Sequence, residues 1–215
     1  MYKYILFDLD GTITDPGEGI TNSVAYALDK FNIKVSDKTS LYKFIGPPLI
    51  ESFMEFYNFS KEDAIKATAL YREYYKDKGI FECELYDYID ELLKKLKDSG
   101  YKVILATSKP QEFAERILEH FDILKYFYFV AGASMDESRN KKDQVIKYAI
   151  DNMPIEDVEL SIMIGDRKHD VLGARVHGIK TIGITYGYGS REEFIENNAA
   201  YILNSPKEIE DFFIN

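Results

Sequence analysis

The sequence of 215 residues contains one cysteine, Cys83, and three histidines. A single cysteine cannot form an intrachain disulfide and cannot supply a cysteine-rich zinc site. His120, His169 and His177 also lack the spacing of zinc ligands. The composition therefore fits a reducing compartment and excludes a disulfide-stapled or zinc-finger fold.

Basic residues are in the minority, with 27 Lys and Arg against 37 Asp and Glu and a formal net charge of -10. This balance argues against nucleic acid or an anionic membrane as the main partner, because both require clustered basic side chains. The sequence also lacks an apolar run long enough to span a bilayer and lacks a signal-peptide pattern. We expect a cytoplasmic protein without a membrane partner, and nothing in the sequence predicts the oligomeric state.

What is present is a regular alternation of apolar runs and helical patterns. An apolar run at residues 4–8 predicts a buried parallel strand, and from residue 86 onward strands alternate with helices, which indicates parallel strands joined by crossovers. Residues 16–82 show only helical spacing. We therefore expect an α/β fold with a doubly wound parallel sheet formed by residues 1–15 and 83–215, and an all-α insertion at residues 16–82.

The first strand ends in Asp8-Leu9-Asp10-Gly11-Thr12. The carboxyl end of a parallel strand is the usual place for a ligand in an open α/β sheet, and alternation along the strand sends Asp8 and Asp10 to the same side. Two carboxylates this close repel each other, so a cation or a shared proton would make the arrangement tolerable. The motif alone leaves two interpretations open, a metal site and an ordinary Asp-Gly turn after a strand.

Three further segments place polar or small residues after strands or at helix starts. Thr107-Ser108-Lys109-Pro110 follows a strand expected at residues 102–106; its hydroxyls are typical helix caps, and a helix N-terminus there would offer free amides to an anion. Lys141 and Lys142 open a helix, where lysine opposes the helix dipole, although a solvated lysine is the default. Gly187-Tyr188-Gly189 is too short for a nucleotide fingerprint and predicts a flexible loop near the active-site edge.

The strand expected at residues 160–164 is followed by Asp166 and, four residues later, by Asp170. We expect both acids to face the strand end that carries Asp8 and Asp10, which would gather four carboxylates in one crevice. Such a cluster costs several kcal/mol unless a cation compensates it. Magnesium fits best, because it prefers oxygen ligands and retains waters and a substrate phosphate.

The sequence resembles the haloacid dehalogenase superfamily of phosphohydrolases in four motifs that occur in the family's order. These are the motif from Asp8 to Thr12, then Thr107, then Lys142, and then the run Gly165-Asp166-Arg167-x-x-Asp170. The resemblance covers essentially the whole chain. The helical segment at residues 16–82 is similar to the cap of the phosphoglycolate phosphatase-like branch. The resemblance implies a Rossmann-like core and hydrolysis through an aspartyl-phosphate, with a cap that selects the leaving group.

The resemblance also implies roles for the acids. Asp8 would be the nucleophile that attacks phosphorus, and Asp10 would be the general acid and base, with its backbone carbonyl on the metal. Asp8 and Asp166 would bind Mg²⁺ through their side chains, and Asp170 would do so directly or indirectly.

Phosphate binding would fall to a further set of groups. By resemblance, Thr107 and the backbone amides of Ser108 and Leu9 would hold the phosphoryl oxygens, and a lysine would neutralise the same group. Lys142 is preferred to Lys141 because it begins the run Lys-x-x-Val-Ile that the family carries.

These features predict a magnesium-dependent phosphomonoesterase acting on a small phosphorylated metabolite, with phosphoglycolate or a nucleoside 5′-monophosphate as the favoured substrate. The alternatives within the superfamily are a phosphosugar mutase and a phosphonatase. A phosphonatase would need a Schiff-base lysine in the cap, for which the sequence offers Lys30, Lys34, Lys38 and Lys43. A non-catalytic binding module is the alternative from a different class.

Overall fold

The computed structural model describes residues 2–136, 138–153 and 158–214. The chain divides into two compact units, one formed by Met1–Thr14 with Leu85–Asn215 and the other by Asp15–Glu84. From the sequence, the divisions are expected after residues 15 and 82. The role of the smaller unit as a cap stays a prediction.

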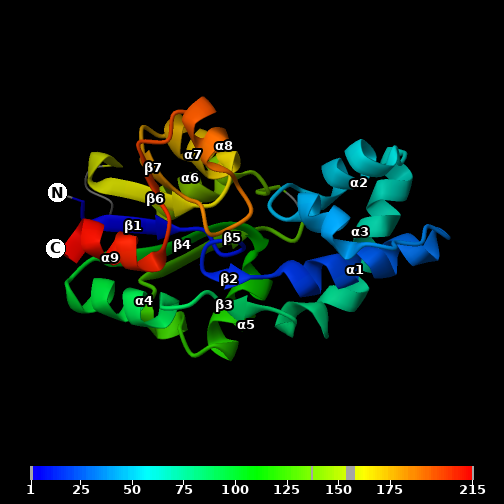
Figure 1. The fold of residues 1–215 in the computed structure, drawn as a ribbon, viewed down its shortest axis with the longest axis horizontal. Helices are drawn as coiled ribbons and strands as arrows, with labels where there is room; N and C mark the ends of the chain where they lie inside the picture. The colour runs from blue at the N-terminus through cyan, green and yellow to red at the C-terminus, as the bar shows by residue number, and fades with distance from the viewer. Residues whose placement is uncertain (1, 137, 154–157, 215) are drawn as a thin grey trace. The chain divides into compact units, whose positions relative to one another are not determined.

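The larger unit is built on a six-stranded sheet whose strands are all parallel (Figure 1). Its strands are β1 (Tyr4–Phe7), β4 (Lys102–Pro110), β5 (Phe129–Ala133), β6 (Ser161–Gly165), β7 (Lys180–Ile184) and β8 (Tyr201–Leu203). They lie in the order β5-β4-β1-β6-β7-β8. This order confirms the predicted α/β fold with a doubly wound parallel sheet.

The central strand is β1, which pairs with β4 on one side and with β6 on the other. Every residue from Tyr4 to Phe7 is buried, which explains why this run is apolar throughout rather than alternating. The strand order reverses at β1, because β4 and β5 lie on one side of it and β6, β7 and β8 on the other. Such a reversal opens a crevice at the carboxyl ends of the neighbouring strands.

Helices cover both faces of this sheet (Figure 1). The unit contains α4 (Ile89–Asp98), α5 (Gln111–His120), η3 (Leu124–Tyr126), α6 (Lys142–Asn152), η4 (Val158–Leu160), α7 (Lys168–Val176), α8 (Arg191–Glu196) and α9 (Pro206–Ile214), where η denotes a 3₁₀ helix. Helix α6 packs against α7, and α4 packs against α9. A buried cluster joins Leu6, Ile104 and Met163 of three neighbouring strands to Val145 and Ile146 of α6. This core fixes where the strand ends meet the first turn of α6.

The smaller unit is helical. It contains α1 (Gly17–Lys30), η1 (Lys38–Phe44), α2 (Leu49–Tyr57), α3 (Lys61–Tyr75) and η2 (Gly79–Phe81), and the short strands β2 (Thr14–Asp15) and β3 (Glu84–Leu85) pair where the chain passes between the units. Aromatic rings form much of its core, with Phe53 lying 5.0 Å from Phe44 and 5.8 Å from Phe59 between ring centroids. Among the described residues of both units, we find no helix with the length and apolar character needed to cross a bilayer.

A buried acid joins α4 to α9. Glu210, which is 6% exposed, accepts hydrogen bonds from the Tyr88 hydroxyl at 2.5 Å and from the ammonium groups of Lys95 and Lys207 at 3.0 and 2.9 Å. The hydrogen bonds from Tyr88 and Lys207 lower the pKa of Glu210 to about 2. The folded state therefore favours the ionised carboxylate.

We expect Glu210→Gln to lower the free energy of unfolding at neutral pH, because glutamine keeps the shape of the side chain but loses the charge that two lysines contact. A carboxyl with a lowered pKa in the folded state adds stability above its unfolded pKa and loses it as the pH falls through its folded pKa. The difference between the two proteins in urea unfolding should therefore shrink as the pH falls from the usual glutamate pKa, roughly 4.3, toward about 2. A constant difference would contradict this assignment.

Candidate active site

Three predicted acids lie at the edge of the sheet where the strand order reverses. Asp8 follows β1 directly, and its amide donates a hydrogen bond of 2.9 Å to the carbonyl of Ile164 in β6. Asp166 follows β6, and Asp170 lies in the first turn of α7. The parallel pairing of β1 with β6 thus brings residues from distant parts of the sequence to one crevice.

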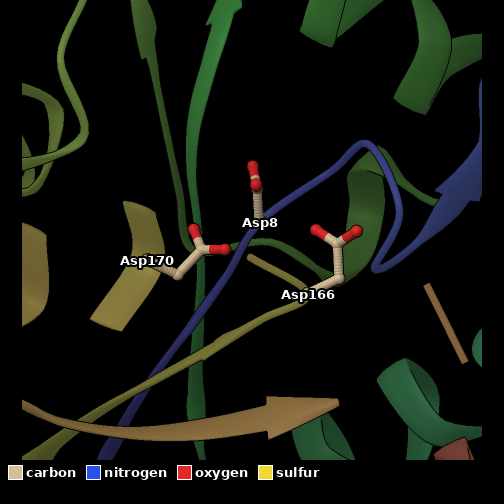
Figure 2. A group of neighbouring side chains, drawn as sticks. All are labelled: Asp8, Asp166 and Asp170. Carbon is tan, nitrogen blue, oxygen red and sulfur yellow. The ribbon is translucent and has the colours of Figure 1, made fainter. Parts of the chain in front are cut away.

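The side chains of Asp8, Asp166 and Asp170 form one group, in which a carboxylate oxygen of each lies within 4.8 Å of the others. Figure 2 shows them extending in the same direction from three different segments. The three residues are 8%, 1% and 0% exposed. Carboxylates this close and this buried repel one another, so the group requires compensating positive charge.

Part of that charge comes from Lys142, which is 5% exposed and begins α6. Its Nζ lies 2.8 Å from Oδ1 of Asp8 and 2.8 Å from Oδ1 of Asp170, and it donates a 3.0 Å hydrogen bond to the carbonyl of Ala106. Lys141 is exposed, so Lys142 is the lysine that reaches the acids. Three carboxylates against one ammonium leave two negative charges, which is the charge that one divalent cation would balance.

Asp166 indicates where a cation would be needed. Its Oδ2 accepts a hydrogen bond of 2.8 Å from the amide of Tyr188, whereas its Oδ1 is buried and has no hydrogen-bond partner in the part of the chain that the structure describes. Burial, together with the charges of Asp170 and Asp8, raises the pKa of Asp166 well above its usual range. A divalent cation bound by Asp8, Asp166 and Asp170 would satisfy this oxygen and remove the repulsion, so these residues fit such a metal.

Among the described residues, Oδ2 of Asp170 has a hydrogen-bond partner, whereas its buried Oδ1 has an ion-pair partner but no hydrogen bond. Oδ2 accepts a hydrogen bond of 3.1 Å from the amide of Arg167 and so caps α7, while Oδ1 faces Lys142. Burial raises the pKa of Asp170 to about 6, although Lys142 opposes this rise. Burial also lowers the pKa of Lys142, but Asp170 and Asp8 raise it by more, to above its ordinary value. Lys142 therefore stays charged at neutral pH.

The fourth predicted carboxylate, that of Asp10, is not one of the three that lie within 4.8 Å of one another. Its Oδ2 forms an ion pair with Nζ of Lys109 at 2.9 Å. The prediction extended the alternation of a strand to Asp10, but β1 ends at Phe7, and the carbonyl of Leu9 already accepts the hydrogen bonds of the following turn. The charges of Asp8 and Lys142 nevertheless act on the Asp10 carboxyl, and the expected gathering of four carboxylates in one crevice stays a prediction for Asp10. Burial raises the pKa of Asp10 and Lys109 lowers it in part, so Asp10 retains a proton more readily than an exposed aspartate does.

The residues predicted to bind phosphate lie at the ends of β1 and β4. Thr107 is buried and Ser108 half-buried. Neither caps a helix, because β4 continues to Pro110 and α5 begins after it without a side-chain cap, so the expected capping role was wrong. The amide of Leu9 donates a hydrogen bond of 2.8 Å to Oδ1 of Asp8 and therefore helps to fix this carboxylate.

Three glycines surround Asp166 so closely that no side chain would fit in their place. A Cβ atom on Gly11 would lie 2.0 Å from Oδ2 of Asp166, one on Gly187 would lie 2.5 Å from its Cβ, and one on Gly189 would lie 1.9 Å from its carbonyl oxygen. The loop predicted at residues 187–189 therefore packs on Asp166 and orients it, a role that the sequence interpretation missed. The paired glycines were the available signal, but what they contact becomes visible only in the folded sheet.

Comparison with known proteins gives a consistent result. A family model described as haloacid dehalogenase-like hydrolase matches residues 5–184. The crystal structure of a predicted phosphatase from Clostridium acetobutylicum is 50% identical, has a TM-score of 0.96 and covers 100% of this chain and 99% of that chain. The similarity therefore includes both units and every strand of the sheet that borders the candidate site.

The curated relatives carry different names. A 5′-nucleotidase from Pseudomonas aeruginosa is 43% identical over 89% of this chain and 86% of its own length. The tyrosine-protein kinase PtkA from Mycobacterium tuberculosis is 37% identical over 97% of this chain and 70% of its own. A phosphoglycolate phosphatase from Vibrio parahaemolyticus is 26% identical over 96% of this chain and 94% of its own. Each name refers to phosphoryl chemistry in that relative.

We expect Gly11→Ala to weaken the binding of a divalent metal by about 10- to 100-fold, because the new methyl group would displace the carboxylate of Asp166. Gly178→Ala is the matched control. Both glycines have positive φ, 79° and 73°, but a Cβ atom on Gly178 would meet nothing within 4 Å. The two variants carry similar backbone strain and differ in their contact with Asp166. Titration calorimetry with Mg²⁺ measures the affinity, and equal affinities in both variants would contradict the role of Gly11.

Proposed function

The chain belongs to the haloacid dehalogenase-like hydrolases and is a phosphoric monoester hydrolase, and we propose that it cleaves a small phosphorylated metabolite through an aspartyl-phosphate on Asp8. The observation that carries the proposal is the buried group of Asp8, Asp166 and Asp170 with Lys142 among them. A carboxylate needs no deprotonation at neutral pH to act as a nucleophile, and here it lies among residues suited to a divalent cation.

In the first half-reaction, an oxygen of Asp8 attacks phosphorus while the bond from phosphorus to the leaving oxygen breaks. Asp10 gives its proton to that leaving oxygen, and the raised pKa of Asp10 suits this step because the carboxyl must carry a proton beforehand. Lys142 and the amide of Leu9 both hold Oδ1 of Asp8, so the nucleophile is oriented before the substrate binds.

In the second half-reaction, the ionised Asp10 takes a proton from a water molecule, and the oxygen of that water attacks phosphorus. The bond from phosphorus to Asp8 breaks, and inorganic phosphate is released. Asp8 is then an ionised carboxylate again and Asp10 carries a proton, so both residues have returned to their initial states.

The proposed ion is Mg²⁺, held by the side chains of Asp8, Asp166 and Asp170 and by the backbone carbonyl of Asp10. When bound, it supplies positive charge that reduces the repulsion between the nucleophile and an anionic phosphate. The unpartnered Oδ1 of Asp166 supports this assignment.

Phosphate binding is assigned to groups at the ends of β1 and β4. Lys142 supplies a permanent positive charge, and Thr107 with the amide of Ser108 would hold the phosphoryl oxygens. The amide of Leu9 would join them by exchanging its hydrogen bond to Oδ1 of Asp8 for one to the phosphoryl group. The burial of Thr107 and Lys142 supports this role, because hydrogen bonds and charges act more strongly where water is excluded.

Nucleoside 5′-monophosphates are the proposed substrate class, ahead of phosphoglycolate. The 5′-nucleotidase relative is more similar to this chain than the phosphoglycolate phosphatase relative is. No nucleic acid or membrane is proposed as a partner.

A phosphonatase would use a Schiff-base lysine, which requires a desolvated pocket to lower its pKa. The four lysines considered for this role, Lys30, Lys34, Lys38 and Lys43, are all exposed. Their exposure favours cleavage of a phosphate ester. One relative is named as a kinase, so the competing reaction is transfer of the phosphoryl group to a protein instead of to water. Release of free phosphate when no acceptor protein is present would indicate hydrolysis.

We expect Asp8→Asn to lower phosphate release from p-nitrophenyl phosphate by about three orders of magnitude or more, because the amide is not a nucleophile. Asp98→Asn, a change at an exposed acid that pairs with Lys94 in α4, is the matched control and should keep full activity. Intact-protein mass spectrometry of acid-quenched wild type should show one added phosphoryl group that Asp8→Asn lacks. Normal turnover by Asp8→Asn would remove the nucleophile assignment.

We expect nucleoside 5′-monophosphates to give a higher kcat/KM than phosphoglycolate in a phosphate-release screen with Mg²⁺ present. The screen should also include sugar phosphates and a phosphonate, because an isomerised sugar phosphate would identify a mutase. A higher kcat/KM for phosphoglycolate would overturn the proposed substrate order while leaving the reaction class unchanged.

A further inference from the structure

Lys109 is a second buried lysine at the same edge of the sheet, and the sequence predicted no role of its own for it, although it lies in the segment Thr107-Ser108-Lys109-Pro110. Its side chain is 4% exposed, and its Nζ lies 2.9 Å from Oδ2 of Asp10. An ammonium group this deeply buried costs free energy unless it is paired with a negative charge. The ion pair with Asp10 supplies that charge and restrains the Asp10 side chain.

The two oxygens of Asp10 have different surroundings. Oδ2 faces Lys109, whereas Oδ1 is buried and has no hydrogen-bond partner among the described residues. An oxygen that delivers a proton to a substrate must be free of other partners. The ion pair therefore leaves Oδ1 as the oxygen available for chemistry.

We propose that Lys109 is a positioning residue for proton transfer, because it holds Oδ2 of Asp10 and thereby directs Oδ1 toward the oxygen of the leaving group. This inference rests on the function proposed above, in which Asp10 is the general acid. Lys109 acts through Asp10, and its ammonium group gives up no proton during the reaction.

The proton balance of the first half-reaction shows what Lys109 would contribute. The bond from phosphorus to the leaving oxygen breaks, and its electron pair stays on that oxygen. The proton on Oδ1 of Asp10 moves to this oxygen, so an alcohol departs and Asp10 is left ionised beside Lys109. Loss of the proton creates a pair of opposite charges, which Lys109 stabilises until the attacking water returns a proton to Asp10.

This role predicts a dependence on the leaving group that a loss of folding would not produce. An alkoxide is a poor leaving group and needs the proton as it departs, whereas p-nitrophenolate is stable as an anion and departs without one. The comparison uses kcat/KM, which covers the steps up to the departure of the leaving group. The later hydrolysis of the aspartyl-phosphate is common to all substrates and does not enter this ratio.

The test is Lys109→Met, which keeps an unbranched side chain and removes the charge. For the alkyl phosphate with the highest wild-type kcat/KM in the screen, we expect kcat/KM to fall by about 100-fold or more, the range of general acid catalysis. For p-nitrophenyl phosphate we expect a fall of less than about fivefold. An equal fall for both esters would overturn the proposal, since it would indicate general damage to the site.

Three further proteins make the result decisive. Lys109→Gln keeps a hydrogen-bond donor without the charge and provides a second variant if Lys109→Met does not fold. Its kcat/KM should again fall more for the alkyl phosphate than for p-nitrophenyl phosphate. The double variant Asp10→Asn with Lys109→Met should have the same ratio of kcat/KM for the alkyl ester to kcat/KM for the aryl ester as Asp10→Asn alone, because Lys109 acts through Asp10. A further change in that ratio would overturn the proposal.

Lys95→Met is the matched control, because it removes a lysine that lies 3.0 Å from a buried acid, Glu210, away from the site. In Lys95→Met, the ratio of kcat/KM for the alkyl ester to kcat/KM for the aryl ester should equal that of the wild type. A fall in this ratio as large as in Lys109→Met would overturn the proposal. Failure of the underlying function is a separate result, in which the wild type and Lys95→Met release phosphate from neither ester.

Discussion

The mutual repulsion of three buried carboxylates at the end of β1 is the constraint on which the arrangement of the larger unit depends. The pairing of β1 with β6 places Asp8 near Asp166, and the start of α7 adds Asp170. Such a group is tolerable only where positive charge is close by, and Lys142 supplies one such charge from the first turn of α6. The remaining excess of negative charge is what a divalent cation would balance.

Ion pairing separates chemically identical side chains into two sets with different electrostatic surroundings. Asp8 and Asp170 share Lys142, whereas Asp10 is paired with Lys109 a short distance along the same sheet edge. The first set keeps its acids in contact with a fixed positive charge, which favours a nucleophile and metal ligands. In the second, burial raises the pKa of the acid, which favours proton transfer. Pairs of acids whose environments differ in this way are how one fold supports both tasks near neutral pH.

Local patterns in the sequence predicted most of the sheet, because buried parallel strands are continuous apolar runs and the helices between them begin and end at recognisable residues. The grouping of Asp8, Asp166 and Asp170 followed from strand ends meeting at one edge, whereas Lys142 was chosen from the family resemblance. The ion pair of Asp10 with Lys109 was not predicted, because no local pattern shows which lysine will lie beside this acid. The capping role of Thr107 failed because β4 runs on to Pro110. The packing of residues 187–189 on Asp166 depends on contacts across the assembled sheet, which no local pattern encodes.

The position of β1 in the sheet also has a consequence for the newly made chain. Residues 4–7 are translated well before their pairing partners in β4 and β6, which lie at residues 102–105 and 161–164. The helical unit of residues 15–84 is synthesised completely before either partner exists. The apolar central strand therefore does not have both of its sheet partners until residue 164 has been translated, and the group of Asp8, Asp166 and Asp170 can form only after that point.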